Sequence, residues 1–343
     1  MRAPLAPLVH VGPRADATLV EQPAASGDAI AVTQASLDFR LENTRVQAGR
    51  RAALMFYERS GLHRGVRVVD TELSVEPGTL ELDRAYWGVR AYDLVDAVFE
   101  RVEITGFGVV TDQHDEGHAV YLNPLGDVAF LDCHFHHNGG QAIQLVRRPT
   151  ESVEPEGPAP GTITVARTRL AENGFNPDRG AFQLSIFGTG QDVTLTDVEI
   201  IAGHDPAVDW PGGLTGGALL IESDGFQMRP RGPNTWWRPA ELPADFEAPF
   251  TTGRAELTRL RIHHKNPNRP VVQIKGCREL LVTDSEFAEG DIHLDLPRKP
   301  GRENGSITWT GNRGEARVFW RGDYVGPAWQ DFQVRGGKLQ RDP

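Results

Sequence analysis

The chain of 343 residues has little of what would mark several classes of protein. It has only two cysteines, Cys133 and Cys277, so a framework of disulfides does not hold it together. No run of about 18 apolar residues occurs, and we therefore expect no membrane span. The apolar stretch near the start is short and is broken by Pro4 and Pro7, so no signal peptide is predicted and the cellular location stays open.

Basic residues are also in the minority. The 36 Lys and Arg against 47 Asp and Glu give a net charge of −11 and a pI near 5.5. Such a chain has few cations to neutralise a phosphate backbone, so nucleic acid is not an expected partner. By contrast, glycine (37) and proline (24) are plentiful, which indicates many turns between short strands.

What the sequence does have is an internal repeat. One pattern recurs six times: two alternating apolar residues, then a dipeptide, then two more alternating positions. The spacing within the pattern is the same in every copy. The copies begin at Ala97, Val128, Ile163, Val193, Ala255 and Leu280. A second alternating pair follows each copy, at Val120/Leu122, Ile143/Leu145, Phe182/Leu184, Leu219/Ile221, Val272/Ile274 and Ile292/Leu294, and Val89/Ala91 is an earlier member.

Period-two alternation predicts strands with one inward and one outward face. One such unit cannot bury its inner face alone, whereas stacked units form a continuous core. The sequence therefore predicts an all-β fold, a single right-handed parallel β-helix of about eight coils. An antiparallel sandwich is the competing fold, but it requires hairpins between neighbouring strands. Cys133 falls at an inward position, where we expect a small buried side chain.

Two regions depart from the repeat. Residues 1–65 are predicted to form an N-terminal cap, with a helix within 44–61, and residues 66–343 the β-helix. Residues 225–253 form a Pro-rich insertion that carries Trp236 and Trp237.

The stretches GHAVYLNPLGDVAFLDCHFHHNGGQAIQL and WGVRAYDLVDAVFERVEITG resemble coils of the right-handed β-helix, pectate-lyase-like superfamily. The resemblance covers roughly residues 65–310. It implies the architecture only, because that superfamily includes lyases, hydrolases, epimerases, phage tailspikes and proteins without activity.

The outward residues of the second strands are expected to line up along the axis. One row reads Arg90, Tyr121, Gln144, Gln183, Leu220, Gln273 and His293, and the next Asn123, Val146, Ser185, Glu222, Lys275 and Asp295. Amide and cationic side chains in such rows suit an extended polar polymer with carboxylates. Mutual hydrogen bonding between stacked glutamines is the structural alternative. The expected substrate contacts are Arg90, Gln144, Arg148, Arg179, Gln183, Gln273, His293, Trp236 and Trp237.

Cleavage of a uronic-acid polymer by β-elimination needs a neutralised carboxylate, a base for the C5 proton and an acid for the leaving oxygen. His118, Tyr121, His137 and Lys275 are candidate bases or acids. Arg147, Arg148 and Arg179 are candidate neutralisers.

The segment Asp112-Gln113-His114-Asp115 is similar to the Asp-Pro-His-Asp motif of bacterial alginate C5-epimerases. That resemblance implies His114 as the base and Arg147 as the neutraliser. Gln113 stands where the motif has proline, and an additional strand separates the motif from the next coil.

Other chemistries fit less well. A glycoside hydrolase needs paired acids, and Glu222, Asp224 and Asp295 include no adjacent Asp-Asp pair. Asp112, Asp115 and Glu116 are the candidate ligands for calcium, and their alternative role is as solvated surface carboxylates of an acidic chain. His134 and His136 should share a face, yet the sequence gives no complete ligand set, so no metal site is predicted.

The sequence thus favours a carbohydrate-active β-helix that binds an anionic polysaccharide, with lyase or C5-epimerase activity. The alternative is a binding or structural β-helix without catalysis. The sugar, the linkage and the oligomeric state stay open.

Overall fold

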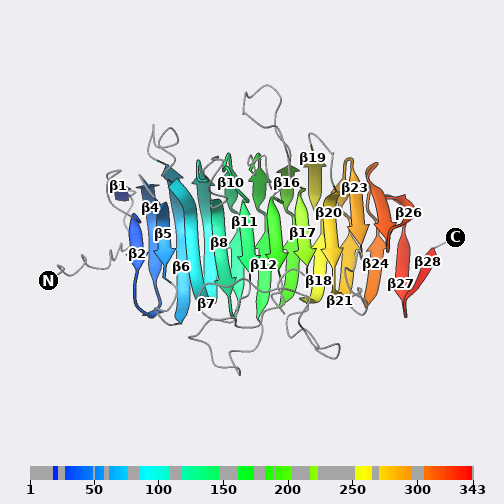
Figure 1. Cartoon of the computed structure of the whole chain (residues 1–343), viewed down its shortest axis with the longest axis horizontal. Helices are drawn as coiled ribbons and strands as arrows, with labels where there is room; N and C mark the ends of the chain where they lie inside the picture. The colour runs from blue at the N-terminus through cyan, green and yellow to red at the C-terminus, as the bar shows by residue number, and fades with distance from the viewer. Residues whose placement is uncertain are drawn as a thin grey trace, which may run out of the picture.

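The protein is built from strands, as a computed structural model shows (Figure 1). The structure describes residues 18–21, 28–48, 51–57, 62–75, 85–108, 117–146, 161–173, 182–187, 191–202, 217–222, 252–264, 270–294 and 305–341. These residues contain 28 strands and no helix. Consequently, no helix in the described part of the chain is a candidate for crossing a membrane.

The strands stack, mostly in parallel, into a long solenoid-like array whose ends hold the N-terminal and C-terminal strands (Figure 1). Three sheets make up the array, and in its regular part each circuit of the chain adds one strand to each sheet. Sheet I contains β9 (Val128–Leu131), β12 (Thr162–Ala166), β15 (Asp192–Thr196), β18 (Thr252–Thr258), β21 (Cys277–Thr283) and β24 (Ser306–Thr310).

Sheet II follows sheet I within each circuit. It contains β1 (Thr18–Glu21), β10 (His134–His136), β13 (Arg169–Ala171), β16 (Glu199–Ala202), β19 (Arg261–His264) and β22 (Glu286–Phe287).

Sheet III completes each circuit. Its parallel strands are β2 (Ile30–Val32), β5 (Arg51–Phe56), β8 (His118–Pro124), β11 (Ile143–Val146), β14 (Leu184–Phe187), β17 (Leu219–Glu222), β20 (Pro270–Lys275), β23 (Asp291–Leu294) and β25 (Arg317–Trp320).

Three long strands take part in more than one sheet. They are β4 (Arg40–Ala48), β6 (His63–Val75) and β7 (Ala85–Thr105), and the short β3 (Ser36–Leu37) pairs with the start of β6. At the C-terminal end the pairing becomes antiparallel through β26 (Asp323–Pro327), β27 (Phe332–Arg335) and β28 (Lys338–Arg341). These last strands change the direction of pairing at the end of the array.

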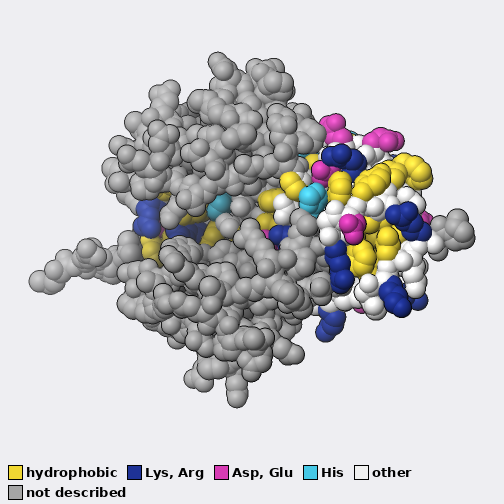
Figure 2. All heavy atoms as spheres, turned by 45° about the vertical axis from the view of Figure 1, so that its right-hand side comes forward, with side chains coloured by type: hydrophobic (Ala, Val, Ile, Leu, Met, Phe, Trp, Pro, Cys, Tyr) yellow, Lys and Arg dark blue, Asp and Glu magenta, His cyan; other side chains and the backbone are white. Residues whose placement is uncertain are grey.

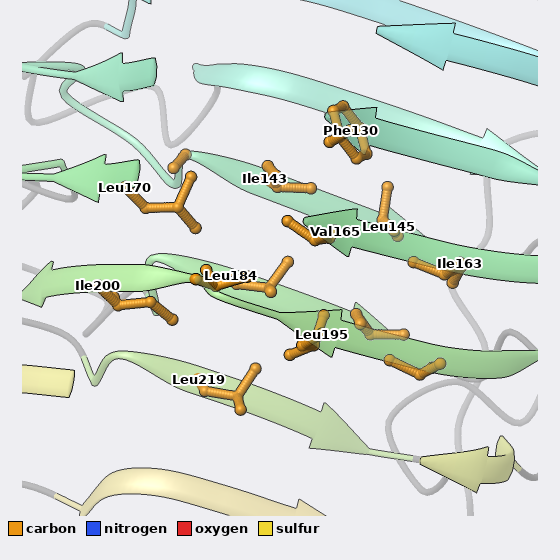
Figure 3. Packing of buried hydrophobic residues seen from close by; sticks show 14 of the residues in the cluster. Phe130, Ile143, Leu145, Ile163, Val165, Leu170, Leu184, Leu195, Ile200 and Leu219 are labelled. Atoms are coloured by element: carbon orange, nitrogen blue, oxygen red, sulfur yellow. The ribbon is translucent and has the colours of Figure 1, made fainter. Parts of the chain in front are cut away.

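The inward residues are those that the alternation predicts. Val128, Ile163 and Val193 are register partners, and so are Phe130, Val165 and Leu195. All are fully or almost fully buried, and Figure 3 shows Phe130, Val165 and Leu195 on successive strands of one core. Cys133 is buried as expected, and burial raises the pKa of its thiol to about 12.

The prediction of a helix within residues 44–61 is wrong. Leu41, Val46 and Ala48 on β4, and Leu54 and Phe56 on β5, point into the core at strand spacing. β5 pairs in parallel with β7, and β2 pairs with β5, so the series of sheet III strands begins before Val89. The apolar run AALMF is compatible with either element, and pairing with β7 decides between them.

An alternating ladder of charges marks the corner between sheets I and II. Nine register-matched positions have left-handed backbone (positive φ): Asn43, Asp70, Arg101, Asp132, Arg167, Asp197, Arg259, Asp284 and Gly311. Asp and Asn tolerate this conformation, whereas Arg rarely adopts it. Each arginine makes two hydrogen bonds to the aspartate one coil earlier, at 2.5 and 2.8 Å for Arg101–Asp70, 2.7 and 2.7 Å for Arg167–Asp132, and 2.7 and 2.8 Å for Arg259–Asp197. The alternation thus ties neighbouring coils in pairs.

Acid should weaken the protein through this ladder. The arginine hydrogen bonds hold the pKa of Asp70, Asp132 and Asp197 below the ordinary value of 3.8. Because the folded pKa is lower than the unfolded one, the stabilisation is complete above about pH 4 and is lost as the pH falls through the folded pKa. The melting temperature of the unchanged protein should fall between neutral pH and pH ~3. It should fall less in a variant in which Arg101, Arg167 and Arg259 are all changed to Gln. Arg67→Gln, an exposed change on β6, should keep the acid sensitivity of the unchanged protein; equal sensitivity in the triple variant would count against the ladder.

Candidate functional site

The outward face of sheet III carries one row of register-matched side chains. The pairings place Met55, Arg90, Tyr121, Gln144, Ser185, Leu220, Gln273, His293 and Phe319 in this row. The row agrees with the sequence prediction at every compared position except one, where Ser185 stands in place of Gln183.

The prediction for Gln183 is wrong because the register of β14 is two residues later than expected. Leu184 and Ile186 are the inward pair, not Phe182 and Leu184. Gln183 is only 1% exposed, and its amide Oε1 accepts a hydrogen bond from Asn173 Nδ2 at 2.8 Å. Gln183 is therefore an internal residue that cannot contact a ligand on the outward face.

Gln183 ends a buried chain of amides at the corner between sheets II and III. Asn138 Nδ2 donates to Asn173 Oδ1 at 2.7 Å, and Asn138 Oδ1 accepts the backbone N–H of Phe107 at 3.0 Å. Asn173 Nδ2 also donates to the Phe135 carbonyl at 3.0 Å. These amides satisfy backbone groups that would otherwise be buried without partners.

A second outward row on sheet III contains Val146, Phe187, Glu222 and Lys275. Phe187, rather than Ser185, occupies the β14 position. Lys275 Nζ lies 3.3 Å from Glu222 Oε1, and both residues are buried. The two side chains therefore contact each other rather than a ligand. This arrangement argues against Lys275 as a base and against Glu222 as a free acid.

The N-terminal part of sheet III surrounds Arg90 with aromatic rings. The guanidinium carbon lies 4.1 Å from the ring centroid of Trp87, 5.3 Å from that of Tyr92 and 5.8 Å from that of Tyr121. Arg90 Nε also donates to the Tyr92 hydroxyl at 2.9 Å. Such rings hold a cation by their quadrupoles and leave guanidinium N–H groups for other acceptors.

Within the described part of the chain, Arg90 has no carboxylate partner. The outward arginines of the ladder, by comparison, are paired with aspartates. Arg90 itself is half-buried. A partly desolvated cation without a counter-ion attracts an anion more strongly than one in open water.

His118 lies beside this arginine, on the same face as Tyr121. The two rings are stacked with centroids 5.9 Å apart. His118 Nδ1 accepts the backbone N–H of Gln141 at 3.1 Å, so a neutral ring carries its proton on Nε2. Burial, with a contribution from the positive charge of Arg90, lowers the pKa of His118 to about 4. At neutral pH His118 is therefore an uncharged hydrogen-bond donor.

Further aromatic residues extend the surface around Arg90, and the sequence analysis did not assign them to a site. Trp87 packs with Ala52 and Met55 into an outward cluster that Tyr57, Tyr86 and Tyr121 border. We refer to Trp87, Arg90, Tyr92, His118 and Tyr121 as the Arg90 site. Gly88 belongs to its framework, because a Cβ there would lie 2.5 Å from Ile104 Cγ2 and 2.6 Å from the Ala119 carbonyl oxygen. The signal in the sequence was the aromatic density of AYWGVRAY.

The other predicted residues of the row lie farther along the array. Gln144 and Gln273 are partly exposed on β11 and β20. His293 stacks at a tilt on Phe319, with centroids 5.2 Å apart, and burial lowers its pKa. At the C-terminal end in Figure 2, hydrophobic side chains adjoin Lys and Arg side chains; there Arg321 lies over the Trp320 ring, 4.7 Å from its centroid.

Several predicted positions lie outside the described residues. They are the candidate base and neutralisers His114, Arg147, Arg148 and Arg179, the stacking residues Trp236 and Trp237, and the acids Asp112, Asp115, Glu116, Asp224 and Asp295. The structure therefore leaves the epimerase-like motif as a prediction.

A separate group of side chains lies on the outward face of sheet II. His134 and His136 stack with ring centroids 4.2 Å apart, which confirms that they share a face. Glu103 on β7 is the register partner of His134, and its carboxylate lies 2.9 Å from His136 Nε2. His137, a candidate base, pairs with Glu172 at 2.9 Å beside this group. The sequence gave no reason to add Glu103, which comes from the preceding circuit of the chain.

Comparisons with family models, with curated proteins and with solved structures each found no match for this chain.

Proposed function

We propose that this protein binds an anionic polysaccharide that contains uronic acid along the outward face of sheet III. The observation that carries the proposal is Arg90, half-buried among three aromatic rings and without a carboxylate partner in the described structure. A sugar carboxylate matches the geometry and the charge that a guanidinium recognises.

The surroundings of Arg90 fit a sugar polymer. Tyr121 offers partly exposed ring surface beside polar groups, which suits a pyranose with its apolar faces and its hydroxyl edges. Trp87 is only 5% exposed and supports the Arg90 guanidinium. Gln144 and Gln273 continue the row with amides that can read hydroxyl groups. Neighbouring members of the row are spaced by about 4.8 Å, the distance between paired strands, so contacts repeat along the axis of the array.

The same site supports proton abstraction from a uronate. Arg90 would neutralise the carboxylate and so acidify the C5 proton, and the Tyr121 oxygen, as phenolate, would take that proton. In a lyase the electron pair then forms the C4–C5 double bond while the C4–O bond breaks, and the leaving oxygen takes the proton that Tyr121 has just received. In an epimerase water delivers a proton to C5 from the opposite face, and Tyr121 gives its proton back to the solvent. His118, as a neutral donor, would hydrogen-bond to the developing negative charge.

The proposal extends to the handedness of the fold, the number of its coils and its insertion. We propose a right-handed parallel β-helix of about eight coils, related to pectate-lyase-like proteins, with an insertion at residues 225–253. The strands β2 and β5, within the segment expected as an N-terminal cap, belong to sheet III. The support is the order sheet III, sheet I, sheet II along the chain and, before the antiparallel C-terminal strands, the parallel pairing of strands with their counterparts one circuit away.

Binding without catalysis is the second candidate function. His118 carries its proton on Nε2, and Lys275 is paired with Glu222, so neither presents a free basic nitrogen to a ligand. A face that selects a polyanion through Arg90 and aromatic rings needs no base.

The test compares binding of polyuronates and of a neutral polysaccharide by titration calorimetry. The unchanged protein should bind the polyuronate, with an affinity that falls as salt rises. Arg90→Ala should weaken that binding by about 10- to 100-fold, the worth of a charge-assisted hydrogen bond, and Arg90→Lys should recover part of it. Arg67→Ala, which removes an exposed arginine of β6, should leave the affinity unchanged.

Catalysis is then measured as incorporation of deuterium from the solvent at C5 or as absorbance of the unsaturated product. Either signal supports an acid–base enzyme if Tyr121→Phe abolishes it. Binding without either signal favours the second candidate. Equal binding by the unchanged protein and by Arg90→Ala, or a preference for the neutral polymer, would refute the proposal.

A further inference from the structure

The outward face of sheet II carries a side-chain group that the polysaccharide proposal does not use. Its members are Glu103, His134 and His136, and one ligand atom from each lies within 4.8 Å of the other two. Two imidazoles and one carboxylate form a common set of protein ligands for divalent transition metals.

Strand geometry produces this set. His134 and His136 are two residues apart on β10, so both side chains leave the same face. Glu103 is the register partner of His134 on the neighbouring strand β7. The set therefore joins adjacent circuits of the chain, which are 31 residues apart by the register of His134 with Glu103.

The neighbours leave these ligands available. The outward row that contains Glu103 and His134 continues through arginines and glutamates. In it Glu72 pairs with Arg45 at 2.6 Å, Glu199 with Arg169 at 3.0 Å and Glu286 with Arg313 at 2.7 Å. Among the described residues of this row, Glu103 differs because its partner is the imidazole of His136 and not a guanidinium. No arginine competes with a metal for this carboxylate in the described structure.

Space and orientation also favour a metal. The register partners of His136 are Thr105 and Ala171, two small side chains. His136 Nε2 points to Glu103, while its Nδ1 lies 2.8 Å from His137 Nδ1 and 3.4 Å from the Thr105 hydroxyl. A hydrogen bond from the second ring nitrogen fixes the tautomer of a metal-binding histidine and the orientation of its ring.

We propose that Glu103, His134 and His136 bind a divalent transition metal such as Zn²⁺, with water completing the coordination. The ion connects β7 with β10 and thereby fastens two successive circuits of sheet II. His137 is a positioning residue, which acts through its contact with His136. The site is independent of the Arg90 site, which lies on sheet III.

Titration calorimetry with Zn²⁺ is the first test, on the full chain after treatment with a chelator. The unchanged protein should bind one equivalent in the micromolar range or tighter. Glu103→Gln, His134→Ala and His136→Ala should each weaken the binding at least ~10-fold. His263→Ala is the matched control, because His263 lies in the same outward row as His136, on β19, and outside the set; its affinity should equal that of the unchanged protein.

Two further readouts separate a built site from loose adsorption. Co²⁺ in place of Zn²⁺ should give the visible absorption of a low-coordinate N,O site, which His136→Ala removes. Zn²⁺ should also raise the melting temperature of the unchanged protein and of His263→Ala but not of His136→Ala, because the ion binds the folded state only. All four changes lie on the surface, and circular dichroism confirms that each variant is folded.

Absence of saturable Zn²⁺ binding would overturn the proposal. So would binding that survives all three ligand substitutions, or binding that His263→Ala weakens as much as His136→Ala.

Discussion

Replacement of Phe130 by alanine should destabilise the protein by about 3–5 kcal/mol. Phe130 is fully buried, stacks on Phe99 with ring centroids 5.0 Å apart and meets Phe135 edge-on at 6.0 Å. The change removes the transfer free energy of the ring and leaves a cavity between two aromatic neighbours that strands on both sides hold in place. Denaturant unfolding followed by far-UV circular dichroism measures the loss.

Two variants control this experiment. Thr164→Ala lies on the outward face of the next strand of sheet I and should change stability by less than about 0.5 kcal/mol. Phe130→Leu keeps much of the apolar volume and should cost clearly less than alanine does. A loss of stability in Phe130→Ala no larger than that in Thr164→Ala would contradict a continuous core between the sheets.

Replacement of Asn173 by alanine should cost about 3 kcal/mol or more, although it removes only a small polar side chain. Asn173 Oδ1 accepts from the backbone N–H of Asn138 at 3.2 Å and from its side chain at 2.7 Å. Asn173 Nδ2 donates to the Phe135 carbonyl at 3.0 Å and to Gln183 Oε1 at 2.8 Å. The alanine variant leaves these groups buried without their partner, and an unsatisfied buried group costs more than a typical hydrogen bond contributes.

Gln144→Ala is the matched control, because it removes an amide from the outward face of sheet III, where water replaces the lost contacts. It should leave the unfolding midpoint nearly unchanged. Hydrogen exchange adds a local readout, since the Asn138 amide should lose protection in Asn173→Ala. An unfolding midpoint for Asn173→Ala equal to that for Gln144→Ala would contradict the buried chain of amides.

The Arg90 site and the group on sheet II show how far a sequence alone leads toward function. Arg90 and Tyr121 were predicted neighbours because one spacing governs both coils. Trp87 and Tyr92 could not be assigned in the same way, since their contact with Arg90 depends on the course of β7 near Gly88. Glu103 could not be predicted for a related reason. It lies one circuit before His134, and nothing in the His-rich segment itself indicates that the two residues are neighbours.

The sequence by itself determined the repeat, the inward residues of sheet I and the parallel stacking that follows from them. Alternation of apolar side chains is a local property, and six copies with one spacing can bury their faces only against one another. Only the tertiary structure decided the register of β14, which buries Gln183 and places Ser185 in the row of Arg90 and Tyr121. It also decided the strand conformation of residues 40–48 and 51–56. Register and strand pairing depend on which neighbour an element meets, and this information lies about one circuit of the chain away.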